Sequence, residues 1–335
     1  MTQAETVVIT GASGGVGRAT ARLFGSRCAR VALLARGRAG LDAAADEIKE
    51  HGGEALVVQV DVADAAQLAA AAEQIVQQWG HIDIWINCAM ATMLSPFMDM
   101  TSEEYRRITE VTYLGYVYGT YEALRWMRPR NRGVIVQVGS SLAYRGIPLQ
   151  SAYCGAKHAV RGFTDSVRCE LLHEQSSIRL SMVQLPAVNT PQFLWSKNNM
   201  PRKHQPVPPI FQPEVCADAI AWAAHHHPRE LYVGISTRKA IWAHTFFPGL
   251  IDRYLGATGY DSQQTNEPED HTKRHNLWEP MERDYGAHGP FDTRAIAQSR
   301  LLQWEKIVRL PVVAVSVVVT EMVSAMVALK RRCQA

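Results

Sequence analysis

The 335-residue sequence has few of the features that mark a specialised protein class. Its six cysteines form no Cys-x-x-Cys pair and no Cys/His spacing that suits zinc. Basic and acidic residues nearly balance, 35 against 32, and the basic ones are scattered apart from Lys330-Arg331-Arg332. We therefore expect no disulfide framework, no metal site and no nucleic-acid partner. A reducing, cytosolic location is expected for the main body of the chain.

Long hydrophobic runs are also scarce. The segment Met1–Thr10 has no basic region ahead of an apolar stretch, so we interpret it as leading into a strand and not as a signal peptide. The run of membrane length is Leu310–Leu329, which would be about 30 Å long as a helix. Glu321 lies near its middle and opposes insertion. Membrane attachment through this run is favoured, and a helix packed on the protein's own apolar surface is the alternative.

The sequence does contain a repeating pattern of short β-branched runs and helix-length segments. The runs are apolar throughout, as is typical of parallel strands that are buried on both faces. The pattern predicts an α/β fold with a doubly wound, Rossmann-type parallel sheet of about seven strands and helices on both faces. The predicted strands are Thr6–Thr10, Arg30–Ala35, Ala55–Val60, Ile82–Ile86, Val134–Val138, Arg179–Gln184 and Leu231–Gly234.

Prolines interrupt this pattern between Pro186 and Pro213, which predicts an extended loop suited to covering a site. After Gly234 the strand signal fades into an extension rich in Gly, Pro and His, to which we assign no chemistry. We therefore divide the chain into a domain built on the Rossmann-type sheet (1–240), an extension (241–305) and an apolar helical tail (306–335).

A glycine-rich turn follows the first predicted strand directly, in the order Thr10-Gly11-Ala12-Ser13-Gly14-Gly15-Val16-Gly17. Gly11 permits a tight turn, Gly15 lets a pyrophosphate approach the backbone, and Gly17 allows the next helix to pack closely. The N-terminus of that helix supplies free N–H groups and the positive end of a dipole. The turn predicts a dinucleotide site, and a purely geometric strand-to-helix connection is the alternative.

The second predicted strand is followed by Arg36, at a position where NAD-selective sites place an acidic residue for the ribose 2′-hydroxyl. A guanidinium there would attract the 2′-phosphate of NADP. The alternative is an exposed arginine at the end of a strand. We expect NADP (NADPH), with NAD the less favoured cofactor.

Tyr153 and Lys157 stand four residues apart, which places both on one face of a helix. We expect the ammonium to lower the pKa of the phenol from its reference value near 10, so that Tyr153 acts as an acid and base. Ser140 follows the strand Val134–Val138 and is placed to hydrogen-bond a substrate carbonyl. An ordinary amphipathic helix is the alternative.

The glycine-rich turn, the Ser-Tyr-Lys set and Pro186-Ala187-Val188-Asn189-Thr190 together resemble the short-chain dehydrogenases/reductases over roughly residues 5–235. The resemblance implies hydride transfer between nicotinamide and a small carbonyl or secondary alcohol, and homo-oligomers. It implies Ser140 as orienter, Tyr153 as acid and base, and Lys157 as the activating cation. Together with the turn and Arg36, it implies cofactor contacts at Gly11, Ser13, Gly15, Val16, Gly17, Arg36, Asp61, Asn87, Ala89, Tyr153, Lys157, Val188 and Thr190.

Two departures from the family pattern bear on activity. The usual Asn-Asn-Ala-Gly appears as Asn87-Cys88-Ala89-Met90, and Thr112 stands where an asparagine is common. A hydroxyl lacks the reach of an amide, so we expect the family's proton relay to run differently here, through Lys157 and water. We expect Met90 to narrow the pocket with a flexible apolar side chain. A catalytically silent NADP-binding scaffold or sensor is therefore the alternative to an enzyme.

Overall fold

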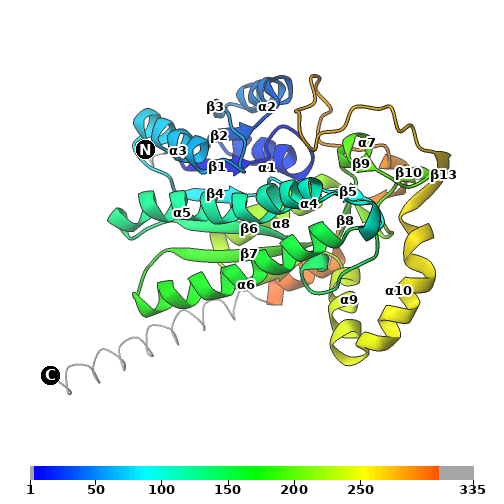
Figure 1. Cartoon of the computed structure of the whole chain (residues 1–335). Helices are drawn as coiled ribbons and strands as arrows, with labels where there is room; N and C mark the ends of the chain where they lie inside the picture. The colour runs from blue at the N-terminus through cyan, green and yellow to red at the C-terminus, as the bar shows by residue number, and fades with distance from the viewer. Residues whose placement is uncertain (1–3, 309–335) are drawn as a thin grey trace, which may run out of the picture.

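A seven-stranded parallel sheet forms the centre of the computed structural model, which describes residues 4–308 (Figure 1). Its strands are β1 (Thr6–Thr10), β2 (Arg30–Ala35), β3 (Glu54–Gln59), β4 (Ile84–Asn87), β6 (Val134–Ser140), β7 (Arg179–Leu185) and β12 (Glu230–Tyr232). They lie in the order β12-β7-β6-β4-β1-β2-β3. This order is that of a doubly wound sheet, so the predicted fold class is confirmed.

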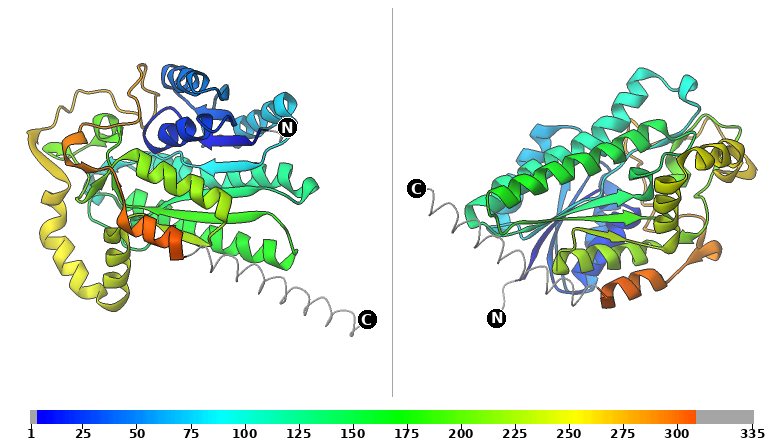
Figure 2. Two further views of the ribbon diagram at one scale, coloured as in Figure 1. Left: turned by 180° about the vertical axis from the view of Figure 1, so that it is seen from behind. Right: turned by 90° about the horizontal axis from the view of Figure 1, so that it is seen from below.

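Helices cover both faces of the sheet (Figures 1 and 2). Helices α1, α2 and α8 form one layer, and α3, α4, α5 and α6 form the other. Their bounds are α1 (Gly15–Gly25), α2 (Arg38–Glu50), α3 (Ala65–Trp79), α4 (Ser102–Thr109), α5 (Gly115–Met127), α6 (Ser151–His173) and α8 (Pro213–His226). Each layer buries its own apolar cluster against the sheet, which is why the strands are apolar on both faces.

Local signals set the ends of several helices. The side chain of Asp64 accepts hydrogen bonds from the first turn of α3, and Gly80 ends that helix in a left-handed conformation with φ 85°. Thr101 and Glu104 form a capping box at the start of α4. These caps are readable in the sequence, and they hold the connections at both ends of the sheet.

The proline-rich segment forms no long helix, as predicted. Between Pro186 and Pro213 it contains only α7 (Gln192–Trp195) and short strands. The minor strands of the chain are β5 (Met93–Leu94), β8 (Ala187–Val188), β9 (Lys197–Asn198), β10 (Arg202–His204), β11 (Ile210–Phe211), β13 (Gln264–Pro268) and β14 (Ala295–Ile296).

The sequence pattern indicates no helix in the extension, but α9 (Ile235–Phe246) leads into it and α10 (Pro248–Ser262) lies within it. Neither has a clear apolar stripe. One side of the pair lines a cavity, while Trp242 and Phe246 on another side are 62% and 71% exposed. Apolar residues therefore lie all around these helices, which hides the helical period that sequence reasoning depends on.

The predicted apolar tail Leu310–Leu329 lies outside the described residues. Within residues 4–308, no helix combines the length and apolar character that crossing a bilayer requires.

A buried polar network lies directly below the carboxyl ends of the central strands. The side chain of Asn87 accepts a hydrogen bond from Trp85 Nε1 at 2.9 Å and donates to Gln137 Oε1 at 3.0 Å and Thr120 Oγ1 at 3.2 Å. All four residues are almost fully buried. Because buried polar groups are costly when unpaired, this network ties β4, β6 and α5 into one arrangement.

We expect Asn87→Ala to lower the free energy of unfolding by about 3 kcal/mol, because it removes one partner from each of three buried polar groups. Denaturant titration followed by circular dichroism measures the change. Gln77→Ala, which removes an exposed side chain on α3, is the control and should shift stability by no more than about 0.5 kcal/mol. An equally small effect at Asn87 would contradict a structural role for the network.

Candidate active site

A cavity of about 550 Å³ opens at the carboxyl ends of the central strands. It lies where the strand order reverses, between β1 and β4, which is the usual ligand position in doubly wound folds. The hydroxyl of Thr10 ties the ends of these two strands together. Its Oγ1 accepts hydrogen bonds from the amides of Cys88 at 2.9 Å and Ala89 at 3.1 Å.

The structure brings nearly all of the predicted site residues to this one cavity. Asn87 is the exception, since it does not line the cavity and its amide belongs to the network below. Those that line the cavity are Gly11, Ser13, Gly15, Val16, Gly17, Arg36, Asp61, Ala89, Ser140, Tyr153, Lys157, Val188 and Thr190.

The glycine-rich turn packs too tightly for side chains at two positions. Gly11 has φ +72°, and a Cβ there would lie 2.8 Å from Ala89 Cα. A Cβ at Gly17 would lie 2.2 Å from the carbonyl oxygen of Gly11. The turn therefore packs closely against Ala89 and the start of α1 only while both positions remain glycine.

Helix α1 points its N-terminus at the same end of the cavity. Its N-cap is Gly14, and no side chain hydrogen-bonds the N–H groups of its first turn. These groups and the helix dipole together favour an anion at this position. The amide of Gly15 contacts a carbonyl oxygen of the extension, that of Gly286, at 3.3 Å.

Arg36 lines the cavity as expected, but its guanidinium has partners that the sequence did not suggest. Nη1 donates to the carbonyl oxygen of Trp278 at 2.7 Å, and Nη2 donates to that of Asn276. The side chain is therefore neither free in solvent nor wholly available to a ligand. The sequence does not suggest these partners because Arg36 and Asn276 lie 240 positions apart in the chain and meet only in the folded structure.

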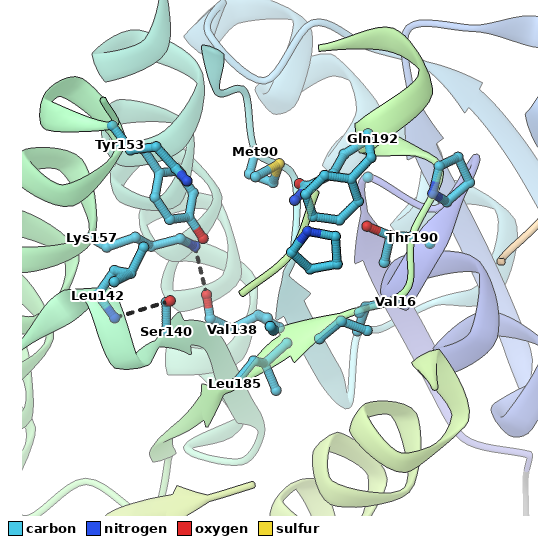
Figure 3. A pocket seen from close by; sticks show the side chains of 18 of the residues that line it. Val16, Met90, Val138, Ser140, Leu142, Tyr153, Lys157, Leu185, Thr190 and Gln192 are labelled. Atoms are coloured by element: carbon cyan, nitrogen blue, oxygen red, sulfur yellow. Dashed lines mark hydrogen bonds between the residues drawn. The ribbon is translucent and has the colours of Figure 1, made fainter. Parts of the chain in front are cut away.

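Ser140, Tyr153 and Lys157 stand together on one side of the cavity, and Val16 and Thr190 stand on the other (Figure 3). Ser140 is the last residue of β6, and its Oγ accepts the amide hydrogen of Leu142 at 3.1 Å. Tyr153 and Lys157 lie in the first two turns of α6. The ammonium of Lys157 lies 5.7 Å from the centre of the Tyr153 ring.

The expected lowering of the Tyr153 pKa is wrong. Burial raises the pKa of this phenol well above its ordinary value, and the hydrogen bond with Ser140 acts in the opposite direction but is the smaller effect. Burial also lowers the pKa of Lys157 to about 8, and it raises the pKa of the Cys88 thiol to about 12. The spacing of Tyr153 and Lys157 along the helix correctly placed both on one face. It could not show how completely the fold excludes water from them, which is what sets their pKa values.

The family model for short chain dehydrogenase matches residues 5–200 of the chain. The chain belongs to the short-chain dehydrogenases. Its predicted family is therefore confirmed, and with it the class of enzyme: an oxidoreductase that acts on CH–OH and C=O groups.

Several relatives show how far the likeness of this short-chain dehydrogenase extends. The uncharacterized oxidoreductase YxnA of Bacillus subtilis is 31% identical over 318 residues, which cover 94% of this chain and 88% of that protein. Dehydrogenase/reductase SDR family member 7B of Bos taurus is 32% identical over 55% of this chain and 58% of its own length. Cis-4-hydroxycyclohexanecarboxylate dehydrogenase of Sinomonas cyclohexanicum is 31% identical over 65% of this chain and 88% of its own. The likeness to YxnA includes most of the extension.

The hydrogen bonds of Thr112 and Lys157 show that these two side chains of the dehydrogenase do not bind each other directly. Thr112 lies in a π-helical turn (Glu110–Leu114), where its hydroxyl donates to the carbonyl oxygen of Ala91 and accepts from the Ala91 amide, both at 2.9 Å. Lys157 Nζ instead donates to Tyr116 Oη at 3.0 Å and to the Val138 carbonyl oxygen at 2.8 Å. Sequence reasoning missed Tyr116, although it stands one helical turn after Thr112.

Burial of Lys157 predicts a specific dependence of stability on pH. The unfolded lysine has a pKa near 10.5 and the folded one about 8, so between these values the unfolded chain binds a proton that the folded chain lacks. The Lys157 contribution to the free energy of unfolding therefore rises with pH across this window. Lys157→Met removes the burial penalty, so its stability relative to the wild type should be greatest below pH 8 and should shrink toward pH 10.5.

Denaturant midpoints of both proteins between pH 7 and 10.5 measure this difference. Lys49→Met, at an exposed lysine of α2, is the control for loss of a surface charge. A difference between Lys157→Met and the wild type that stays constant over the window would mean that Lys157 titrates as an ordinary lysine.

Proposed function

We propose that the chain is an NADP-dependent oxidoreductase that uses Ser140, Tyr153 and Lys157 to interconvert a carbonyl and a secondary alcohol. The observation that carries this proposal is one cavity with the glycine-rich turn at one end and the Ser-Tyr-Lys set at the other. An anion site and a proton donor at opposite ends of one cavity are the arrangement that a dinucleotide oxidoreductase needs.

The residues at the turn fit a dinucleotide. Gly11 and Gly17 let the turn fold tightly against Ala89 and the start of α1, and no side chain caps the N-terminus of α1, so its first turn can face a diphosphate. Arg36 supports a preference for the 2′-phosphate of NADP, since a guanidinium has five N–H donors and the carbonyl oxygens of Asn276 and Trp278 engage only part of them. Bound there, the cofactor supplies or accepts the hydride.

The buried side chains at the other end of the cavity supply the proton for the reaction and stabilise the group that donates it. With its pKa raised by burial, Tyr153 is protonated at neutral pH and can donate its phenolic proton to the oxygen of a carbonyl that gains a hydride. The Ser140 hydroxyl accepts from Leu142 and hydrogen-bonds the Tyr153 phenol, which places it beside the proton donor to orient that oxygen. Lys157 has three N–H donors, two of which bind Val138 and Tyr116, and the charge stabilises a phenolate once the proton has left.

Apolar side chains in the cavity lining support an apolar substrate. They include Leu142, Ile147 and Val207, together with Ile251 and Leu255 of α10. One relative acts, by its name, on a hydroxycyclohexane, which is a secondary alcohol on an apolar ring. We therefore favour a ring-borne or otherwise apolar ketone and alcohol pair as the substrate class.

A catalytically silent NADP-binding scaffold is the second candidate. The observation that favours it is Thr112, whose hydroxyl donates its hydrogen to the Ala91 carbonyl oxygen and so has none to donate to a relay toward Lys157. A scaffold would bind cofactor without turning over aldehydes, ketones or quinones, and this outcome for the wild-type protein would exclude the enzyme.

We expect Tyr153→Phe to lower turnover of the best carbonyl in such a panel by about 100-fold or more, because the proton donor is lost. Binding of NADPH, followed by nicotinamide fluorescence, should be nearly unchanged. Tyr118→Phe is the matched control on the neighbouring helix α5 and should keep wild-type turnover. Turnover at the wild-type rate in Tyr153→Phe would remove Tyr153 from the chemistry.

Arg36→Asp should shift the ratio of NADH to NADPH affinity toward NADH by about tenfold or more, because a repelling charge replaces an attracting one at the 2′ position. The ratio is the readout because loss of contacts with the extension affects both cofactors alike. Arg38→Asp makes the same charge change at an exposed position two residues further on. If both variants leave the ratio unchanged, Arg36 does not read the 2′ position.

A further inference from the structure

One segment of the extension crosses the cofactor end of the cavity. Residues 269–291 contain no helix or strand, and Figure 1 shows this part of the chain running from β13 over the molecule to a point beside α2. We call residues 276–286 the strap. Within it Asn276, Pro280, Met281, Arg283 and Tyr285 line the same cavity as the glycine-rich turn.

The strap is anchored on both sides of its exposed middle. Leu277 is fully buried in the apolar cluster on the α3 and α5 side of the sheet. Just past the other end, Ala287 is buried against Ala19 of α1 and Ala217 of α8. The strap therefore bridges the two helical layers across the edge of the sheet where the cavity opens.

Backbone carbonyls at the first end of the strap hold two arginines. Those of Asn276 and Trp278 accept from Arg36, and that of Leu277 accepts from Arg107 Nε at 3.0 Å. Charge-assisted hydrogen bonds of this kind are stronger than neutral ones. They fix the strap directly over the end of β2, where the 2′ position of a bound dinucleotide would lie.

The second end of the strap is tied to α1. Asp284 pairs with the almost fully buried Arg18, which Glu47 of α2 also holds. The next residue, Tyr285, packs edge to face against Trp195 with ring centres 5.0 Å apart. One end of the strap thus contacts the 2′ region and the other contacts the diphosphate region.

The cavity is present with these contacts made, so the strap leaves room for a ligand beneath it, although its Gly286 carbonyl oxygen accepts from the Gly15 amide at 3.3 Å. We propose that the strap is a clamp of the dinucleotide site, which closes over the adenosine diphosphate half of a bound cofactor and slows its release. This rests on the proposed function as a cofactor-binding enzyme.

Release of NADPH from the full chain tests the clamp. The protein is loaded with NADPH and mixed with excess NADP, and the loss of nicotinamide fluorescence gives the release rate. Asp284→Asn removes the charge partner of Arg18 at constant size, and Tyr285→Ala removes the ring that packs on Trp195. Each variant should release NADPH about fivefold faster or more, as expected for loss of one partly exposed contact. Glu267→Gln, exposed in the same extension, is the control and should release it at the wild-type rate.

Thermal unfolding recorded for each variant shows which of them are folded, and either folded variant decides the question because the two changes break different contacts. Release at the wild-type rate would overturn the clamp while leaving the proposed function intact. Slower release or tighter binding would also overturn it, since the strap would then compete with the cofactor. A wild-type chain that binds neither NADPH nor NADH would refute the cofactor site itself.

Discussion

The reversal of winding direction between β1 and β4 is the constraint on which the rest of the structure depends. Strands on either side of this point carry their connections away from each other, so the crevice between them has no crossing chain to fill it. Thr10 holds the two strand ends together by binding the amides after β4. Gly11 can then approach Ala89 closely, and the N-terminus of α1, which no side chain caps, faces the crevice. Each feature of the proposed cofactor site follows from that geometry.

Burial governs the chemistry at the other end of the cavity. Lys157 is 2% exposed and its ammonium is held by a carbonyl oxygen and a phenol, without a carboxylate partner among the contacts described for it. A dry site of this kind keeps the Tyr153 phenol protonated and makes the ammonium easier to deprotonate. Burial makes it costly to keep the Lys157 ammonium charged in the resting site. The same low dielectric strengthens the attraction between this ammonium and a negative charge that forms during the reaction.

The extension links the two ends of this site. Helices α9 and α10 contribute apolar walls to the substrate side, and the strap covers the cofactor side. The family model stops at residue 200, while the likeness to YxnA covers 94% of the chain. The extension is thus an addition to the common nucleotide-binding fold that encloses its cavity, in keeping with a fold that hosts many chemistries through its connecting segments.

The sequence by itself determined the sheet, the glycine-rich turn and the grouping of Ser140, Tyr153 and Lys157. These depend on local rules, namely apolar runs, glycine backbone freedom and the helical repeat, which act over a few residues. Only the tertiary structure decided the partners of Arg36, the contact of Lys157 with Tyr116, and the raised pKa of Tyr153. These depend on segments that meet across long stretches of chain and on the exclusion of water between them. Neither leaves a periodic or spacing signal in the sequence.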